Sequence, residues 1–166
     1  MIESDKNQHI FTFDVEGGNF NAAGTVSTRI KSLLKQLQMP DDVVRRSAIV
    51  SYEAEINIVS YAKKGVIRIT VSPDQVMIEA DDTGQGIPDI NLAMQQGYST
   101  ANHLIREMGF GAGMGLFNIK SYSDKFDITS EVDKGTFLRI IIKEHVTYRM
   151  DYGHRNHCRK IKPQIH

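Results

Sequence analysis

The stretch of sequence that does most to decide the fold is a glycine loop that opens onto a helix, Gly109-Phe110-Gly111-Ala112-Gly113-Met114-Gly115. Four glycines in seven residues let another molecule approach the backbone closely. The amphipathic turn that follows, Leu116 to Tyr122, indicates an ordered helix rather than a flexible linker. The free N–H groups at such a helix start and the helix dipole both favour phosphate, so this segment predicts an anion site.

A second glycine segment lies upstream, at the end of a predicted strand, and has the sequence Asp82-Thr83-Gly84-Gln85-Gly86. A carboxylate at a strand end can accept a hydrogen bond from an exocyclic amine, and the glycines let a flat ring come close. A plain turn has the same composition, so this segment alone leaves both interpretations open.

Still further upstream, an amphipathic helix carries Ser51-Tyr52-Glu53-Ala54-Glu55-Ile56-Asn57. Glu53 and Asn57 are four residues apart, so they project from the same face of the helix. An amide oxygen is a hard ligand that suits Mg²⁺, and a carboxylate can accept a proton. A solvated pair on a helix surface is the alternative, because such pairs are common.

Other phosphate-binding motifs are absent from the sequence. No G-x-x-x-x-G-K-[ST] occurs, which excludes a P-loop NTPase. No G-x-G-x-x-G occurs either, which excludes the Rossmann fingerprint and the glycine loop of the common protein kinases.

Hydrophobic periodicity predicts elements on both sides of these segments. The second helix is expected to end at Lys63-Lys64-Gly65, a cationic last turn with glycine at the exit. The order of elements predicts an α+β fold, a two-layer α/β sandwich in which a mixed or antiparallel sheet carries helices on one face. The predicted strands are 9–15, 66–71, 76–80, 126–132 and 136–142, and the predicted helices are 20–37, 41–62, 89–96 and 116–123.

Taken in order, the segments resemble the nucleotide pocket of the GHKL, or Bergerat-fold, ATPase family. Glu53-x-x-x-Asn57 is similar to the N box, Asp82-x-Gly84-x-Gly86 to the G1 box, and Gly111-x-Gly113-x-Gly115 to the G2 box. Gly135-Thr136 resembles the Gly-Thr that closes the same pocket. Each motif is weak by itself, but the ordered set covers roughly residues 8–143 and is specific.

Within the family, the chain looks most like the small bacterial anti-sigma factors and switch kinases of stress signalling. These phosphorylate a serine or threonine on a small STAS-domain partner. The finer match rests on residues 57–65, 87–90 and 96–100. The resemblance implies an ATP-dependent serine/threonine protein kinase that acts as a regulatory switch.

The resemblance also implies roles for individual residues. Asn57 would hold Mg²⁺, Asp82 would recognise adenine, and Glu53 would be the catalytic general base. The triphosphate would lie under a lid from about Tyr98 to Gly113. The residues implied to bind ATP are Asn57, Asp82, Gly84, Gly86, Ser99, Thr100, Arg106, Gly111, Gly113, Gly115 and Thr136.

One departure from the family pattern falls in the lid. Related switch proteins tend to carry a lysine just after the Ser/Thr pair, where this chain has Ala101-Asn102-His103. Arg106 is the candidate that would supply the missing charge.

Two other functions remain open at the level of sequence. One is a nucleotide-dependent binding module that sequesters a sigma factor or activates a PP2C-type phosphatase. The other is a detached histidine-kinase ATPase domain, which the sequence favours less because only His9 precedes the N box, within a strand pattern. A homodimer is also compatible with the resemblance.

Charge and composition limit the kinds of molecule that the chain is expected to bind and the cellular compartment in which it is expected to work. Residues 144–166 carry five Lys/Arg against two Asp/Glu, and residues 1–143 carry 15 against 18. A mildly acidic body argues against nucleic acid as the main partner. No apolar run approaches the length of a membrane span, and the single cysteine, Cys158, is compatible with a cytoplasmic protein.

The chain is therefore expected to form an ATP-binding domain over residues 1–143 and a basic C-terminal extension over 144–166. The extension contains His154-x-x-His157-Cys158, which could ligate zinc but lacks a second spaced pair. A solvated basic extension is the expected interpretation.

Overall fold

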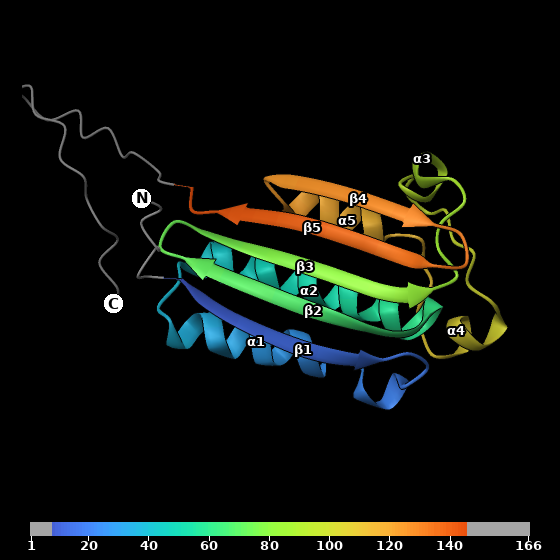
Figure 1. Cartoon of the computed structure of the whole chain (residues 1–166), viewed down its shortest axis with the longest axis horizontal. Helices are drawn as coiled ribbons and strands as arrows, with labels where there is room; N and C mark the ends of the chain where they lie inside the picture. The colour runs from blue at the N-terminus through green and yellow to red at the C-terminus, as the bar shows by residue number, and fades with distance from the viewer. Residues whose placement is uncertain (1–7, 146–166) are drawn as a thin grey trace, which may run out of the picture.

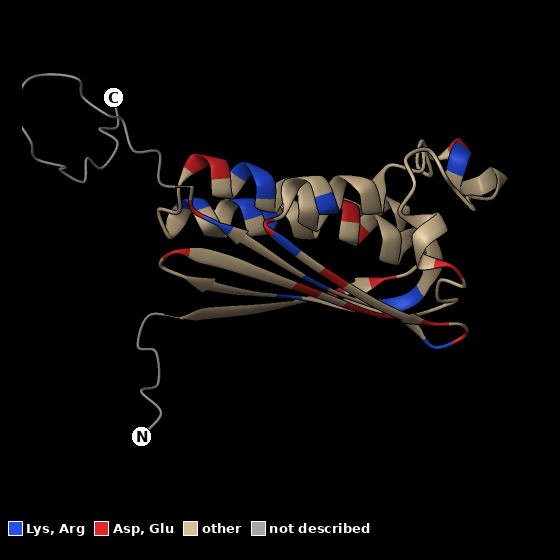
Figure 2. Ribbon diagram, turned by 90° about the horizontal axis from the view of Figure 1, so that it is seen from above, with Lys and Arg blue, Asp and Glu red and all other residues tan. Residues whose placement is uncertain are grey.

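The computed structural model describes residues 8–145. They form a two-layer α+β fold. One layer is a five-stranded antiparallel sheet, and the other is made of helices that pack on one face of that sheet (Figures 1 and 2). The strand order is β1-β2-β3-β5-β4. The elements are β1 (His9–Glu16), the 3-10 helix η1 (Phe20–Ala22), α1 (Thr25–Gln36), α2 (Asp41–Tyr61), β2 (Ala62–Ser72), β3 (Gln75–Gly84), α3 (Ile90–Ala93), α4 (His103–Glu107), α5 (Gly115–Tyr122), β4 (Lys125–Glu131) and β5 (Gly135–Lys143).

The core lies between the sheet and α2. In the register of the sheet, Ile78 of β3 is paired with Ile69 of β2 and Ile140 of β5, and all three are fully buried. Alternate residues of a strand face the same side of a sheet, so these isoleucines belong to one apolar face. Helix α2 packs on this face between α1 and α5 (Figure 1).

The boundary between α2 and β2 differs from the sequence prediction. The helix ends at Tyr61, and Lys63-Lys64-Gly65 belongs to β2 instead of forming a last helical turn. Lys64 pairs with Glu16 and Gly65 pairs with Val15 in the neighbouring strand β1. Strand pairing therefore overrides a local pattern that is typical of a helix end.

The first predicted helix is also interrupted. Residues 20–22 form a 3-10 turn, and α1 begins only at Thr25 after Gly24, whose φ is +88°. The buried carboxylate of Glu55 on α2 accepts hydrogen bonds from the backbone N–H groups of Gly24, Val26 and Ser27, at 3.0, 3.0 and 2.9 Å. The start of α1 is therefore fixed by a side chain from another helix.

The remaining elements follow the predicted order, and both hairpins form. Strands β2 and β3 are longer than predicted, α3 is shorter, and α4 within residues 98–113 was not predicted. No helix among residues 8–145 is long and apolar enough to cross a membrane. Only residues 144 and 145 of the C-terminal extension are described, so His154, His157 and Cys158 lie outside the described residues.

Candidate functional site

A cavity of about 810 Å³ lies at the end of the sheet where β3 ends. Helices α3 and α4 lie at the same end of the molecule (Figure 1). The walls of the cavity come from α2, the start of α5, the end of β3, the start of β5 and the glycine-rich loops between β3 and α5. This volume lies within the range of small-molecule and cofactor sites.

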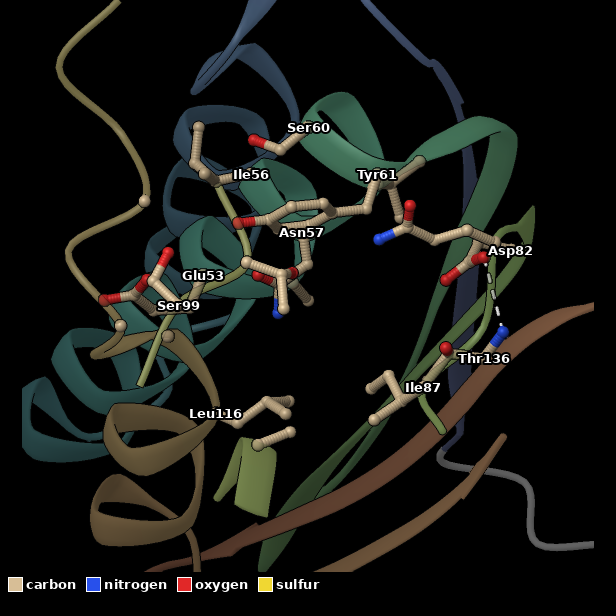
Figure 3. A pocket seen from close by; sticks show the side chains of 18 of the residues that line it. Glu53, Ile56, Asn57, Ser60, Tyr61, Asp82, Ile87, Ser99, Leu116 and Thr136 are labelled. Carbon is tan, nitrogen blue, oxygen red and sulfur yellow. Dashed lines mark hydrogen bonds between the residues drawn. The ribbon is translucent and has the colours of Figure 1, made fainter. Parts of the chain in front are cut away.

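The wall formed by α2 presents three polar side chains one turn apart, Glu53, Asn57 and Tyr61 (Figure 3). No hydrogen bond within residues 8–145 engages the Asn57 side chain, whose amide oxygen is thus available to a ligand. The spacing of four residues places Glu53, Asn57 and Tyr61 along one helix face; the sequence predicted this for Glu53 and Asn57.

Glu53 is tied to the first turn of α5. The Asn118 side chain donates a hydrogen bond from Nδ2 to Glu53 Oε1 at 2.6 Å. A Cβ built on Gly115 would lie 3.5 Å from Glu53 Oε2 and 3.2 Å from Asn57 Oδ1. The start of α5 therefore lies directly against both α2 side chains.

The opposite wall contains Asp82, near the end of β3. The backbone N–H of Thr136 on β5 donates a hydrogen bond to Asp82 Oδ1 at 3.3 Å (Figure 3). Burial raises the pKa of the Asp82 carboxyl; the Thr136 hydrogen bond opposes this rise, and the charge of Asp81 adds to it. A half-buried carboxylate with this environment gains from a hydrogen-bond donor supplied by a ligand.

Thr136, which donates to Asp82, is itself held by the hydroxyl of Ser130. The Thr136 hydroxyl lies 2.9 Å from Ser130 Oγ of β4. Ser130 also donates to the Gly135 carbonyl and accepts from the backbone N–H of Ile87. This network joins the loop after β3 to the β4–β5 hairpin.

Two glycines of the loops are required by close backbone approach. Gly113 has a φ of +74°, and a Cβ on it would lie 2.5 Å from the Tyr98 carbonyl oxygen. Gly86 has a φ of +68°, and its Cβ would collide with the Glu131 carbonyl oxygen. Both positions exclude any side chain, so the loops keep their shape only with glycine.

The start of α5 provides an anion-binding surface. Its N-cap, Met114, makes no side-chain cap hydrogen bond, and Gly115 at the first helical position lines the cavity. The first N–H groups of the helix are thus free to bind an anion within the cavity.

Most of the residues predicted to bind a nucleotide are brought together in this cavity, and two are not. Gly84 lies in β3, outside the cavity wall. Arg106 is also outside it, and its Nε donates to the Ala101 carbonyl at 3.1 Å. The residues that line the cavity are Glu53, Asn57, Asp82, Gly86, Ser99, Thr100, Gly111, Gly113, Gly115 and Thr136.

The described part of the cavity wall contains no lysine and no arginine. Positive potential for an anion therefore comes from backbone N–H groups and the α5 dipole, unless a cation enters with the ligand.

Residues 46–146 match the family described as histidine kinase-, DNA gyrase B- and HSP90-like ATPase. This chain belongs to that ATPase family. The match begins within α2 and covers every residue of the cavity wall, whereas β1 and α1 precede it.

Individual relatives of this chain have more specific names. The chain is 36% identical over 104 residues to serine/threonine-protein kinase RsbT of Bacillus subtilis (strain 168), covering 60% of this chain and 71% of that protein. It is 31% identical over 99 residues to the anti-sigma F factor of Thermoanaerobacter sp. (strain X514), covering 60% of this chain and 62% of that protein. Among solved structures, the mycobacterial sensor histidine kinase MprB gives a TM-score of 0.48 at 12% identity, over 81% of this chain and 97% of that chain.

Two residues were missed from the sequence: Asn118, which contacts Glu53 in the cavity wall, and Glu55, which caps α1 and does not line the cavity. Asn118 lies in the helix after the glycine loop, three residues beyond Gly115, so helical spacing alone could have placed it near the cavity. Glu55 was overlooked beside Glu53, although it lies four residues after Ser51 and eight after Ser47, on a buried stripe of α2.

Proposed function

We propose that the chain is an ATP-dependent serine/threonine protein kinase that acts as a regulatory switch by phosphorylating a STAS-domain partner. The observation that carries this proposal is the Glu53 carboxylate in the cavity wall, beside Asn57 and the first residue of α5. Membership of the ATPase family and the kinase RsbT among the relatives support it.

The geometry supports one orientation of ATP. Adenine would donate its exocyclic N–H to Asp82, between the apolar side chains of Ile58, Ile87 and Leu138. The phosphates would then extend toward the loop of Gly111, Gly113 and Gly115 and the uncapped start of α5.

Magnesium fits the residues present. The described residues contain no group of three or more His, Cys, Asp or Glu side chains that could hold a metal. Mg²⁺ commonly uses one or two protein ligands, with phosphate oxygens and waters as the others. The Asn57 amide oxygen, close to Gly115, would serve as that protein ligand, and bound Mg²⁺ would neutralise phosphate charge that the wall's own side chains do not.

Glu53 would act as general base for the acceptor. It would take the proton from a serine or threonine hydroxyl as that oxygen forms its bond to the γ-phosphorus. The bond from the γ-phosphorus to the β–γ bridging oxygen breaks, and ADP leaves with the electron pair. The proton on Glu53 then passes to solvent, which restores the base.

A second function is favoured by the anti-sigma F factors among the relatives. In this alternative, nucleotide binding controls the affinity for a sigma factor or a PP2C-type phosphatase, and little phosphoryl transfer occurs. The same cavity would serve both functions, so only the outcome of a transfer assay separates them.

The assay combines the protein with ATP, Mg²⁺ and a STAS-domain protein encoded nearby, and phosphorylation is followed by intact mass and phosphopeptide mapping. We expect phosphoserine or phosphothreonine on the partner. Glu53→Gln should lower kcat at least about a hundredfold while leaving ATP affinity within about threefold.

Glu16→Gln is the matched control, because Glu16 is an exposed carboxylate on β1 away from the cavity. It should transfer at the wild-type rate. Nucleotide-dependent binding of the partner without transfer by the wild-type protein would refute the kinase and leave the binding module.

A further inference from the structure

Among the described residues, Asn118 donates a side-chain hydrogen bond to the proposed base, and it lies on the helix that begins at the proposed phosphate site. We propose that Asn118 is a positioning residue for Glu53, holding one carboxylate oxygen so that the other faces the phosphate site. The inference rests on the proposed kinase function, since it assigns a role within that reaction.

The contact is short and comes from a rigid position. Asn118 Nδ2 lies 2.6 Å from Glu53 Oε1, and the backbone N–H of Asn118 donates to the Met114 carbonyl at 2.8 Å. The asparagine is thus fixed in the first hydrogen-bonded turn of α5. Its side-chain amide therefore projects from a backbone position that the start of α5 sets.

The hydrogen bond makes the two oxygens of Glu53 different. Oε1 accepts from Asn118, whereas Oε2 lies toward Gly115, whose ideal Cβ position is 3.5 Å away. Asn57 Oδ1 faces the same Gly115 position. Oε2 is therefore the oxygen on the side of Gly115, the first residue of the proposed phosphate site.

Orientation of a general base matters because the proton must transfer at hydrogen-bond distance. A misplacement of about 1 Å can lower a rate on the order of a hundredfold. Without the Asn118 amide, the Glu53 side chain is free to rotate about its terminal torsion, and less of the population presents Oε2.

Two substitutions separate this role from simple packing. Asn118→Asp keeps the size and shape of the side chain but removes the donor, and it places a second carboxylate against Oε1. Asn118→Ala removes the donor and most of the side-chain volume together. Ser121→Ala is the matched control on the same helix, because Ser121 is exposed and donates only to the Phe117 carbonyl within α5.

The measurements are kcat for transfer to the STAS partner, ATP affinity, thermal unfolding, and the pH dependence of kcat from pH 8 to pH 6. We expect kcat to fall about ten- to a hundredfold in Asn118→Ala and Asn118→Asp, with ATP affinity within about threefold. Ser121→Ala should match the wild-type protein.

The pH profile provides the signature that packing would not produce. Two carboxylates in contact take up a proton more readily than one, and the protonated carboxyl again donates to Glu53. The ratio of the Asn118→Asp rate to the wild-type rate should therefore rise as the pH falls.

Four results overturn the proposal. If wild-type protein transfers phosphate but Asn118→Asp transfers equally well, Asn118 does not position the base. A ratio that stays constant with pH, or a loss of transfer that follows a loss of ATP affinity, also overturns it while the kinase function stands. If the wild-type protein transfers no phosphate, the proposed function fails and this role fails with it.

Discussion

The ionised Asp82 side chain lowers the stability of the folded protein, because its carboxylate is half buried and too few hydrogen-bond donors surround it. Its pKa is raised by burial from the ordinary value of 3.8, against the Thr136 hydrogen bond and with the help of Asp81. The folded state binds the proton more tightly than the unfolded state. Stability therefore falls as the pH rises from 3.8 through the raised pKa, and it stays lower above that.

Asp82→Asn should consequently stabilise the nucleotide-free protein at pH 7, since the amide oxygen can still accept from Thr136. Below pH 3.8 the two proteins should converge, as the carboxyl is then protonated in both states. Nucleotide affinity should fall at least about tenfold, because the substituted side chain turns an N–H donor, instead of an acceptor oxygen, toward the exocyclic N–H of adenine. Thermal unfolding between pH 3 and pH 8 and a fluorescent-ATP titration measure both effects.

Asp81→Asn is the control for this pair, because Asp81 is exposed on β3 and does not line the cavity. It should leave nucleotide affinity unchanged. A loss of stability in Asp82→Asn at pH 7, or retained wild-type affinity, would contradict the interpretation of Asp82.

At the scale of residues, the sequence predicted the polar side chains that repeat at a helical or loop spacing. Glu53 and Asn57 share a face of α2, and Asp82 ends a strand, so pattern alone placed them. Arg106 was predicted to contact phosphate because of its charge. In the structure its side chain donates to the Ala101 carbonyl instead, and residue spacing does not predict that contact.

Helix α1 depends on a carboxylate that belongs to α2. Glu55 is 1% exposed and accepts hydrogen bonds from three backbone N–H groups at the start of α1. Gly24 at the N-cap position has no side chain that could replace it. Glu55 thus performs for α1 what an N-cap residue of its own would normally do.

Glu55→Ala should destabilise the protein by about 3 kcal/mol or more, because buried N–H groups lose their acceptor. Chemical denaturation monitored by circular dichroism measures the change. Glu53→Ala, two residues away on the same helix, is the comparison and should cost much less, since Glu53 is only half buried and makes one side-chain bond. Equal losses in the two variants would show that Glu55 is not the cap.

Element boundaries were the part of the fold that local sequence predicted least well. Lys63-Lys64-Gly65 has the composition of a helix end, yet β1 recruits it into the sheet. Helix α4 was missed because its buried residue, Ile105, packs against loop residues such as Gly111 and not against a periodic apolar face. The first error arises because a strand distant in sequence decides the conformation, and the second because a short helix packs on its own loop.

Across the whole molecule, one buried arginine joins the start of α2 to the far edge of the sheet. Arg46 is 7% exposed and forms ion pairs with Asp42 at 2.7 Å and Asp124 at 2.8 Å, and it also donates to the Lys143 carbonyl. Burial acts to raise the pKa of both carboxyls, but hydrogen bonds and the Arg46 charge outweigh it and lower both.

A lowered pKa gives stability that is present above the unfolded value of 3.8 and is lost as the pH falls through the folded value. Arg46→Met, which keeps much of the volume, should cost about 2–4 kcal/mol at pH 7. The difference in the free energy of unfolding between this variant and the wild-type protein should become smaller below pH 3.8. Urea unfolding at pH 7, 5 and 3 measures it, and a difference that is constant with pH would contradict this account.

The architecture as a whole was predictable because it follows from the order of the elements. The predicted hairpins, the antiparallel sheet and the single helical layer are all confirmed. The order of strands in the sheet, with β5 between β3 and β4, came from no local signal. In the folded chain β5 packs against α2, whereas β4 at the edge packs against α5.

The glycine loop over the cavity contacts η1 through Phe110, a residue of the cavity wall. Phe110 stacks on Phe20 of η1, with ring centroids 5.7 Å apart and planes inclined at 19°. Such a stack contributes about 0.5–1.5 kcal/mol. Under the proposed function, a nucleotide held against the Gly111 and Gly113 loop would leave more slowly while Phe110 is anchored on η1, a segment that does not line the cavity. A partner bound at η1 would then change the lifetime of the bound nucleotide without entering the cavity.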